Sequence, residues 1–394
     1  MITRVISFSF CLVIFSASFG FCAQKEPSVR IAILQDAPSI NVAVRGKFEI
    51  YNMSDNSILS AGNNFKKELL KGYPDKIKLS NIKVDAKAIS IRLVNNGLIY
   101  INDTPYREQV NIFRKDNRKV CVINELGLES YIKGVLPYEV SAWWPTETLK
   151  AQAVVARTYA LYRMQYTKAK DFDLTSDVYS QVYGGKIAER WRTNEAVDST
   201  RGEVLTFEGK VFPAYYYATC GGHTEDAKEL WQIDIIPLKG VVCGFCAGSP
   251  HFKWRAAFPL KEINKKLQDK NAPAANITAI EILGRDNSGR AAQLKLTYED
   301  MSSSVISAKD FRQKMGPNLV RSTNFIMADI ADIIYFEGYG WGHGVGLCQW
   351  GAYFMAGRHN DYHVILNFYY PGAKTQTQMG TDIVSSDINT DRHR

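Results

Sequence analysis

The sequence lacks several features that would define its class at once. It has no internal repeat, no low-complexity block and no run of basic residues of the kind that forms a nucleic-acid-binding arm. Its 48 Lys and Arg exceed its 40 Asp and Glu by only +8, and the excess is dispersed. We therefore expect no nucleic-acid partner, although a weak positive field suits an acidic polymer. Hydrophobic residues make up 46% and charged residues 22% of the 394 residues, which excludes fibrous and disordered chains.

Long uncharged apolar runs are also missing, except at the N-terminus. Arg4 precedes an uncharged stretch from Val5 to Phe19, and small residues and the polar Gln24 follow. This pattern predicts a secretory signal peptide over residues 1–23, and hence a protein of the periplasm or cell envelope. An uncleaved segment that anchors the chain to the membrane is the alternative. Lipidation at Cys22 is disfavoured because the preceding Phe21 is bulky.

The remaining chain predicts an α+β fold with two lobes. Strands are expected at Val29–Leu34, Phe48–Tyr51, Ala88–Leu93 and Val120–Ile123, with a hairpin turn at Asn95–Gly97 leading into Leu98–Ile101. A central helix begins near Pro145 and carries an apolar stripe of Leu149, Ala153, Ala156 and Ala160. The expected parts are a β-rich region (24–120), a core (121–252 and 331–373), an inserted small α/β domain (253–330) and a polar tail (374–394). In the insert, Leu260, Ile263 and Leu267 predict a short amphipathic helix, and a second helix is expected over Ser307–Met315 with Ser307 as its cap.

One carboxyl stands out. Glu139 is placed by the sequence in a short loop before the central helix, among Pro137, Tyr138, Trp143 and Trp144. Aromatic and proline neighbours desolvate a carboxyl, raise its pKa and keep a proton on it near neutral pH. A protonated carboxyl beside aromatic rings that stack on sugars is what glycosidic cleavage requires. An ordinary loop glutamate is the competing interpretation.

Glycine occupies alternate positions around Trp341 and His343, from Gly338 to Gly346. In an extended segment such glycines leave one side bare, so that a ligand and the backbone approach closely. No Lys-Ser/Thr pair follows, so this is not a phosphate-binding loop. His343 is expected either to bind substrate or to orient Glu139, and a buried core histidine is the alternative. In a loop near residue 180, Gln181 could bind a glycan or belong to a simple turn.

Cysteine is scarce and its number is odd after the signal segment. The spacing of Cys220, His223, Cys243, Cys246 and His251 fits a structural zinc site. The ligands would be the three cysteines and one of the two histidines. A disulfide is the alternative, because exported proteins favour disulfides. No cofactor is expected to be required for catalysis.

Taken together, these segments resemble the SpoIID/LytB family. The likeness rests on ordered motifs: Glu129–Glu139, Trp144–Ala160, Gln181–Gly185, Ala218–Gly222, Gly340–Ala352 and Tyr369–Gly372. The resemblance implies binding of peptidoglycan glycan strands, and in SpoIID-like members a lytic transglycosylase that acts on strands stripped of stem peptides. The MurNAc–GlcNAc bond breaks without water and leaves a 1,6-anhydro end.

The resemblance also implies roles for particular residues. Glu139 falls on the catalytic acid/base position. Residues at motif positions around the glycan groove are Lys150, Gln152, Arg157, Gln181, Tyr183, Gly221, Gly222, Trp341, His343 and Gln349. The chain departs from many relatives at Tyr179-Ser180, where His-Cys is frequent, so a metal site there is not carried over.

Two other functions remain open. The family includes non-catalytic members, so the chain could be an amidase enhancer that holds glycan strands, with an amidase or other wall and division proteins as partners. A hydrolase would need a base for water, and Glu225 and Asp226 are the carboxylates near a motif. Sporulation, division and general wall remodelling are not distinguished.

Overall fold

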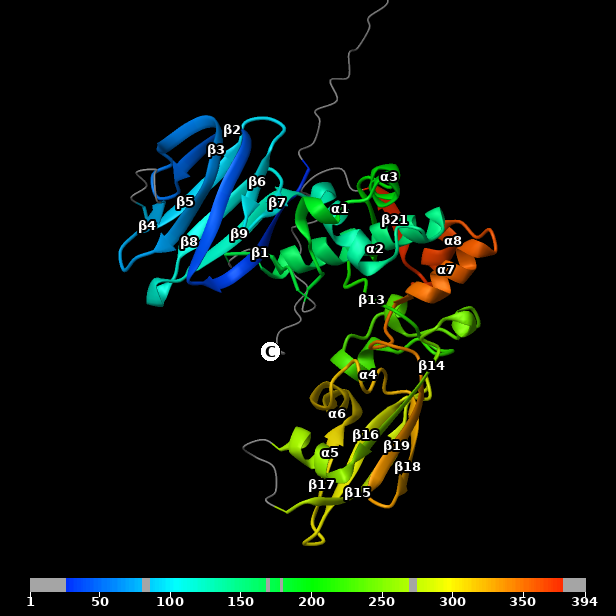
Figure 1. The fold of residues 1–394 in the computed structure, drawn as a ribbon. Helices are drawn as coiled ribbons and strands as arrows, with labels where there is room; N and C mark the ends of the chain where they lie inside the picture. The colour runs from blue at the N-terminus through cyan, green and yellow to red at the C-terminus, as the bar shows by residue number, and fades with distance from the viewer. Residues whose placement is uncertain (1–25, 80–85, 168–170, 178–179, 269–274, 378–394) are drawn as a thin grey trace, which may run out of the picture.

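The computed structural model describes residues 26–79, 86–167, 171–177, 180–268 and 275–377 (Figure 1). Helices alternate with several separate sheets, so the fold is of the expected α+β class. Apolar side chains of the described residues gather into three hydrophobic cores. The expected signal segment, with Cys22, lies outside these residues. Within them, no helix combines the length and the apolar character needed to span a membrane.

A large sheet is built mainly from the N-terminal residues. Its strand order is β10-β1-β9-β8-β5-β2-β3-β4, with β6 also paired to β2 and β7 paired to β6. The strands are β1 (Ser28–Ala37), β2 (Ser39–Asn52), β3 (Ile58–Gly72), β4 (Ile77–Leu79), β5 (Ala88–Leu93), β6 (Leu98–Ile101), β7 (Thr104–Tyr106), β8 (Gln109–Arg114), β9 (Val120–Gly127) and β10 (Leu174–Thr175), with a 3-10 turn η1 (Asp116–Arg118) before β9. Alternate apolar residues face the first core.

The hairpin expected between β5 and β6 does not form. Both strands pair with β2 instead, β5 along Phe48–Asn52 and β6 along Val42–Arg45. The turn at 95–97 therefore shifts the chain along β2, so that β5 and β6 pair with different parts of this one strand. The long β2 supplies enough edge for both strands, and this pairing is not visible in the local sequence.

Helix α1 (Leu128–Glu139) replaces the strand-like stretch and loop that the sequence suggested around Glu139. Leu128, Tyr131, Ile132 and Val135 are buried, and their spacing of three and four residues is helical. Pro137 lies in the last turn and did not prevent the helix. Glu139 is consequently the last residue of a helix, and the following chain turns towards α2.

Helix α2 (Thr146–Tyr166) is the expected central helix, and Pro145 is its N-cap residue. All of Ala151 to Leu161 is buried, because α1, α3 (Trp191–Ser199) and two helices near the C-terminus pack around it. The second core lies on its far side and is completed by α4 (Ala227–Trp231), α7 (Gln349–Gly357), α8 (Tyr362–Tyr369), β11 (Glu203–Phe207), β13 (Tyr216–Tyr217), β20 (Leu347–Cys348), η3 (Ile236–Leu238) and η4 (Cys246–Gly248). Strands β12 (Lys210–Val211) and β21 (Lys374–Thr377) flank β11 in a small sheet, and η2 (Gly185–Ala188) packs against α1 and β7.

The third core belongs to the inserted segment. One sheet is β14 (Lys253–Pro259), β19 (Ile333–Tyr339) and β18 (Phe325–Ile330), and the other is β15 (Ile277–Arg285), β16 (Ala291–Tyr298) and β17 (Ser303–Ser307). Helices α5 (Leu260–Leu267) and α6 (Ala308–Met315) lie where the sequence placed them, and Ser307 caps α6 as expected. The core includes Ile334 and Phe336, so it extends past the expected boundary at residue 330.

The first residues of the expected polar tail form a β-strand. Lys374–Thr377 forms β21, which pairs with Glu203–Thr206 of β11. A free strand edge accepts a polar segment as readily as an apolar one, because the pairing is made by the backbone. Residues from 378 onwards lie outside the described part.

Candidate active site

Glu139 lies at the C-terminal end of α1, where its side chain is partly buried. Burial raises the pKa of Glu139 to about 7, although hydrogen bonds from Tyr216 and from the backbone of Val182 act in the opposite direction. A carboxyl with this pKa carries a proton on about half of the molecules at neutral pH. It can therefore donate a proton and accept one back within the same reaction.

A chain of hydrogen bonds leads from the protein interior to Glu139. The buried Tyr131 hydroxyl donates to Gln181 Oε1 over 3.1 Å, and Gln181 Nε2 donates to the Tyr216 hydroxyl oxygen over 3.1 Å. Since Tyr216 accepts from Gln181, its own hydrogen is directed at the Glu139 carboxyl. Gln181 is thus buried and orients a neighbour of Glu139.

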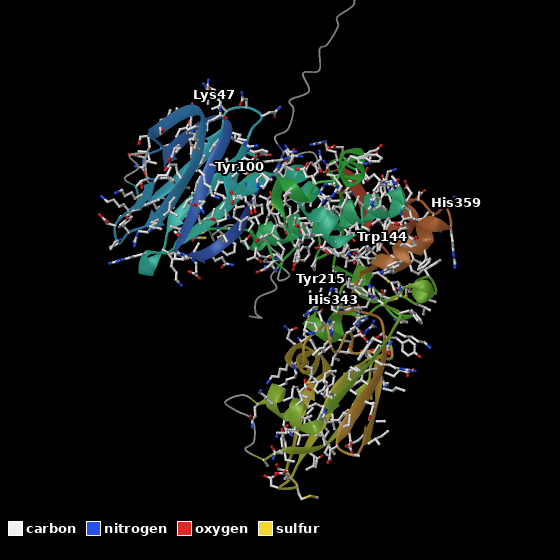
Figure 2. All side chains as sticks on the ribbon, viewed as in Figure 1. Lys47, Tyr100, Trp144, Tyr215, His343 and His359 are labelled. Carbon is white, nitrogen blue, oxygen red and sulfur yellow. The ribbon has the colours of Figure 1, made fainter. Side chains whose placement is uncertain are left out.

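His343 fixes the backbone beneath Tyr216. Its Nδ1 accepts from the Val345 N–H over 3.1 Å, so Nε2 carries the hydrogen and donates to the Tyr216 carbonyl over 3.1 Å. Burial, assisted by the charge of Arg312, lowers the pKa of His343 to about 3. The imidazole is therefore neutral and has both ring nitrogens occupied. Figure 2 shows it beside Tyr215, whose ring lies 5.9 Å away between centroids.

Four other residues expected to line the groove are buried and bind other side chains of the protein. Arg157 is 1% exposed and forms a two-pronged ion pair with Glu129, with N–O distances of 2.9 and 2.7 Å. Gln152 accepts from Gln349 over 3.4 Å, and both side chains are buried. Tyr183 donates to Asn124 over 2.7 Å. Direct contact with a glycan would require these side chains to leave their partners.

The remaining expected residues are more accessible. Lys150 binds Glu147 over 2.8 Å and keeps 25% of its side chain exposed. Trp341 is partly exposed, stacks edge-on with His251 at 4.8 Å and lies beneath the Arg321 guanidinium at 4.7 Å. Gly221 and Gly222 adopt positive φ angles of 77° and 117°, in a turn after Cys220.

Aromatic side chains gather near the start of α2. Trp144 lies 5.0 Å from Trp350 and 5.2 Å from Tyr353, and Trp350 lies 6.3 Å from His251. All four are partly exposed, whereas Trp143 is 78% exposed. Rings that are open on one face can stack on the apolar faces of sugars.

The glycine-rich segment differs from the extended chain that the sequence suggested. Gly340, Gly342, Gly344 and Gly346 all have positive φ, between 78° and 125°. At Gly346 a Cβ would approach the Tyr215 carbonyl oxygen to 2.0 Å. The glycines therefore allow the segment to pack against β13, and the ligand-facing role expected from their alternation gives way to internal packing.

The cysteines form a cluster with a different fourth member from the one expected. The Sγ atoms of Cys220, Cys243, Cys246 and Cys348 all lie within 4.8 Å of one another and are buried, so the cluster could hold a metal ion. His223 instead points Nδ1 at the Thr224 carbonyl, and His251 stacks on Trp341. Neither histidine belongs to the cluster. Cys348 was not predicted as a ligand because it lies more than 100 residues from the other three cysteines.

Glu225, considered as a base for water, is 1% exposed. It accepts from the Ser288 hydroxyl over 3.1 Å and from the Asp226 N–H over 2.9 Å, and the Arg290 guanidinium lies 3.8 Å away. Burial raises the pKa of Glu225 to about 7 despite Arg290. The carboxyl is enclosed by the inserted segment and does not face solvent.

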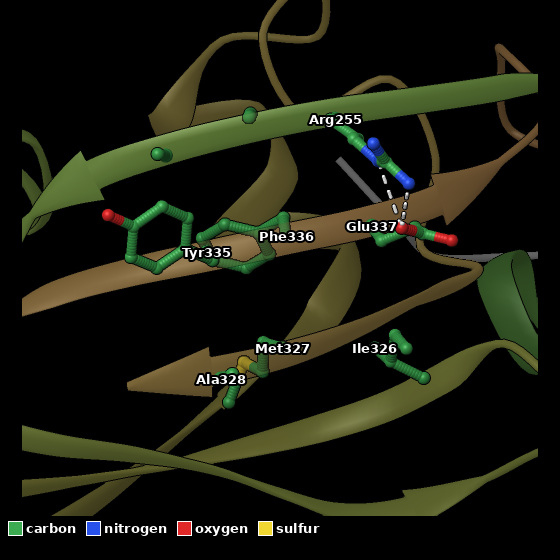
Figure 3. A pocket seen from close by; sticks show the side chains of 9 residues that line it. Arg255, Ile326, Met327, Ala328, Tyr335, Phe336 and Glu337 are labelled. Atoms are coloured by element: carbon green, nitrogen blue, oxygen red, sulfur yellow. Dashed lines mark hydrogen bonds and ion pairs between the residues drawn. The ribbon is translucent and has the colours of Figure 1, made fainter. Parts of the chain in front are cut away.

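An open hollow of about 490 Å³ lies elsewhere, over β14, β18 and β19. Figure 3 shows its lining, with Arg255 and Glu337 paired over 2.9 Å beside Ile326, Met327 and Tyr335. None of the residues expected at a site belongs to it. Sequence reasoning also missed Tyr216, whose only signal is its place in a Tyr-Tyr-Tyr run shortly before Cys220.

Comparison with known proteins places the chain among cell-wall proteins. Residues 116–207 match the family described as stage II sporulation protein, and residues 244–346 match a domain of unknown function. An uncharacterized protein of Brachyspira hyodysenteriae is 34% identical over 363 residues, which cover 90% of this chain and 94% of that protein.

Two Bacillus subtilis proteins are also similar. Stage II sporulation protein D is 28% identical over 310 residues, which cover 75% of this chain and 86% of that protein. An amidase enhancer is 27% identical over 372 residues, which cover 82% of this chain but 51% of the enhancer. This chain thus spans about half the length of the enhancer.

Proposed function

Because this chain belongs to the SpoIID/LytB family, whose members serve cell-wall remodelling, we propose that it is a peptidoglycan lytic transglycosylase. Its substrate would be glycan strands without stem peptides. The observation that carries this proposal is the partly buried Glu139 carboxyl, whose pKa is raised to about 7 by burial. Glu225 has a similarly raised pKa, but it is 1% exposed, whereas the Glu139 side chain keeps part of its surface accessible.

The proposed reaction moves one proton out and one proton back. The Glu139 carboxyl donates its proton to the oxygen that joins C1 of MurNAc to C4 of GlcNAc, and the C1–O bond breaks. The 6-hydroxyl of the same MurNAc then bonds to C1 and returns its proton to Glu139. The products are a GlcNAc 4-hydroxyl and a 1,6-anhydro-MurNAc end, and no water is consumed.

Tyr216 suits the second half of this cycle. Once Glu139 has lost its proton, the Tyr216 hydroxyl donates a charge-assisted hydrogen bond to the carboxylate. Gln181 and His343 hold Tyr216 in place through its hydroxyl and its carbonyl. A single supported carboxylate fits a reaction that needs no second one, since Glu225 is enclosed.

We propose that a metal at the four-cysteine cluster would be structural. Four thiolates complete a tetrahedral shell and leave no position for substrate, whereas catalytic sites keep one position open. The acid and base steps described above use only Glu139 and its neighbours. No cofactor is therefore required for the proposed cleavage.

The groove residues and partners follow from the same proposal. Trp341, Lys150 and the aromatic rings near Trp144 would contact the strand, and the cations would meet the lactyl carboxylates that remain on it. An amidase that removes stem peptides would prepare the substrate. The relative named as an amidase enhancer supports such a pairing. The site of action would be the cell envelope.

The test compares products from peptidoglycan glycan treated beforehand with an amidase. Mass spectrometry of the soluble products is performed for the unmodified protein, for Glu139→Gln and for Glu195→Gln, an exposed residue of α3 that serves as control. We expect 1,6-anhydro-MurNAc ends from the unmodified protein and the control, and none from Glu139→Gln. Untreated glycan, with its stem peptides, should yield little product.

Other results would point elsewhere. Reducing ends would indicate hydrolysis. No cleavage by any of the three proteins, with strand binding retained in a sedimentation assay, would refute the enzyme and support a glycan-binding partner of other wall enzymes. Equal cleavage by Glu139→Gln and the unmodified protein would remove Glu139 from the catalytic position.

A further inference from the structure

We propose that Cys220, Cys243, Cys246 and Cys348 are the four thiolate ligands of one Zn²⁺ ion that fixes the strand carrying Tyr216. Three chain segments supply the ligands: the turn after β13, the Cys-x-x-Cys loop at η4, and the end of β20. All four Sγ atoms lie within 4.8 Å of one another in the second core. This inference does not depend on whether Glu139 cleaves glycans.

The spacing of the sulfur atoms fits a single ion. Four ligands at about 2.3 Å from zinc in a tetrahedron are separated by about 3.8 Å. The observed separations, up to 4.8 Å and with Cys220 and Cys246 at 3.2 Å, bracket this value. The described cysteines are all free thiols, and no pair is at bonding distance. The space between them is too small for a cluster of several iron and sulfide atoms.

Hydrogen-bond donors surround the sulfurs. Cys348 Sγ accepts from the backbone N–H of Cys220 over 3.2 Å and of Gly351 over 3.3 Å, and Cys220 Sγ accepts from Gly222 over 3.4 Å. The Tyr369 hydroxyl lies 3.2 Å from Cys243 Sγ and can donate to its thiolate. Four thiolates and Zn²⁺ carry a charge of −2. Donors of this kind stabilise such a buried negative site and orient its ligands.

Gly351 allows Tyr369 and helix α7 to approach the sulfur atoms closely. A Cβ at this position would lie 1.8 Å from the Tyr369 hydroxyl and 3.3 Å from Cys243 Sγ. Only glycine lets helix α7 start directly against the cluster. Arg290 supports the same loops from the other side, because it donates to the carbonyls of Cys220 and His223 over 2.8 and 2.9 Å.

The cluster lies next to the strand that holds the Glu139 neighbour. Strands β13 and β20 are parallel, with Tyr216 opposite Leu347 and Tyr217 opposite Cys348. Such a two-residue pairing has little stability of its own. An ion that joins Cys348 to Cys220 ties the ends of both strands together. We infer that zinc keeps Tyr216 at hydrogen-bonding distance from Glu139.

Metal content gives the first test. The protein is purified without added chelator, and zinc and iron are measured by mass spectrometry for the unmodified chain, Cys348→Ser and Cys121→Ser. Cys121 is a buried free cysteine of β9 outside the cluster and is the matched control. We expect one zinc per chain in the unmodified protein and in Cys121→Ser, and a loss of most zinc in Cys348→Ser.

Thiol counting separates zinc from disulfides. Denaturation with a chelator should expose five free thiols in residues 26–394 of the unmodified protein, all of them protected before denaturation. A chain without metal whose intact mass is lower by four hydrogen atoms would carry two disulfides and refute the proposal. Stoichiometric iron, or full zinc in Cys348→Ser, would refute it equally.

Backbone hydrogen exchange tests the link to the active site without any activity measurement. Removal of zinc by a chelator should speed exchange at least tenfold in peptides covering 214–222 and 341–352. Peptides of β8 and β9 should be unchanged. If zinc is present but its removal leaves both peptide groups equally protected, the ion does not fix β13. A failure of glycan cleavage alone would leave these results untouched.

Discussion

At Glu139 burial and hydrogen bonding act on one carboxyl in opposite directions. Burial favours the protonated form, and the Tyr216 hydroxyl favours the ionised form. Their balance leaves the pKa at about 7, where both forms are populated at neutral pH. The sequence predicted the desolvation from Pro137 and the tryptophans. It did not predict the opposing hydrogen bond from Tyr216, because this residue approaches from a strand 77 positions further along the chain.

The substitution Tyr216→Phe removes the hydroxyl that lowers the pKa of Glu139 and keeps the aromatic ring. The pKa of Glu139 should rise above about 7, so the proposed cleavage, which requires a protonated acid, should persist to higher pH than in the unmodified protein. The maximal rate should fall about 10- to 100-fold, because a charge-assisted hydrogen bond contributes about 1.5–3 kcal/mol. A pH–rate profile on amidase-treated glycan measures both. If the alkaline limb of the profile did not shift, Tyr216 would not control the pKa of Glu139.

Glu139 should also destabilise the fold at neutral and higher pH. Its pKa is about 7 in the folded state against 4.5 ordinarily, so the folded state binds more protons and stability falls as pH rises between these values. Glu139→Gln should therefore raise the free energy of unfolding at pH 8 by about 1–3 kcal/mol, and the gain should vanish below pH 4.5. Urea unfolding at both pH values checks this. An equal gain at both would contradict it.

At the scale of elements, α1 and α2 are joined by a buried ion pair. Arg157 of α2 reaches Glu129 of α1, and Glu129 also accepts from the Gly202 N–H over 3.0 Å. Arg157 further donates to the Glu203 carbonyl over 2.8 Å, before β11 enters the second core. One guanidinium thus sets the relative position of two helices and a strand. Since Glu139 ends α1, this arrangement also sets the place of the Glu139 carboxyl.

Breaking this pair should be costly. Arg157→Ala leaves Glu129 buried and unpaired, so we expect a loss of about 3–5 kcal/mol in the free energy of unfolding. Lys67→Ala removes a pair with Asp103 whose side chains are 50% and 75% exposed, and it should cost less than about 1 kcal/mol. Guanidinium denaturation of both variants gives the comparison. A small effect of Arg157→Ala would argue for a role in substrate contact instead.

Local pattern predicted α2, α5, α6 and several strands because their apolar periodicity is regular. It failed at α1, where Pro137 and the aromatic residues suggested a loop. It also failed where pairing is distant: β5 and β6 share β2, and β13 pairs with β20. The ten residues expected in a groove were chosen as motif members. Several of them, such as Arg157 and Gln152, prove to be buried, because a motif marks packing as well as contact.

At the scale of the whole molecule, the inserted segment is connected to the second core by Arg290 and Glu225. Arg290, at the β15–β16 turn, is 1% exposed and donates to the carbonyls of Cys220 and His223 in the second core. Glu225 is bound from the inserted side by Ser288. The contact is polar and buried, so it depends on every partner being present.

In Arg290→Ala, the inserted segment and the second core should therefore unfold at different temperatures. We expect the unfolding temperature of the protein to fall by several degrees and the calorimetric transition to broaden or split, because the inserted core loses its link to the second core. Arg255→Ala, at a side chain 82% exposed and paired with Glu337, is the control and should leave the transition unchanged. A single sharp transition at the original temperature in Arg290→Ala would contradict this account.

The pairing of His343 with the Tyr216 carbonyl has a consequence for the order of synthesis. The two residues are 127 positions apart, and the whole inserted segment is made between them. A chain emerging from the ribosome can complete its first sheet and both long helices, with Glu139 in place, before its last quarter exists. Tyr216, whose hydroxyl donates to Glu139, is then not yet held by His343. Under the proposed mechanism, a fragment that ends before His343 would carry Glu139 without the residue that holds Tyr216 against it, and cleavage would begin only once the chain is complete.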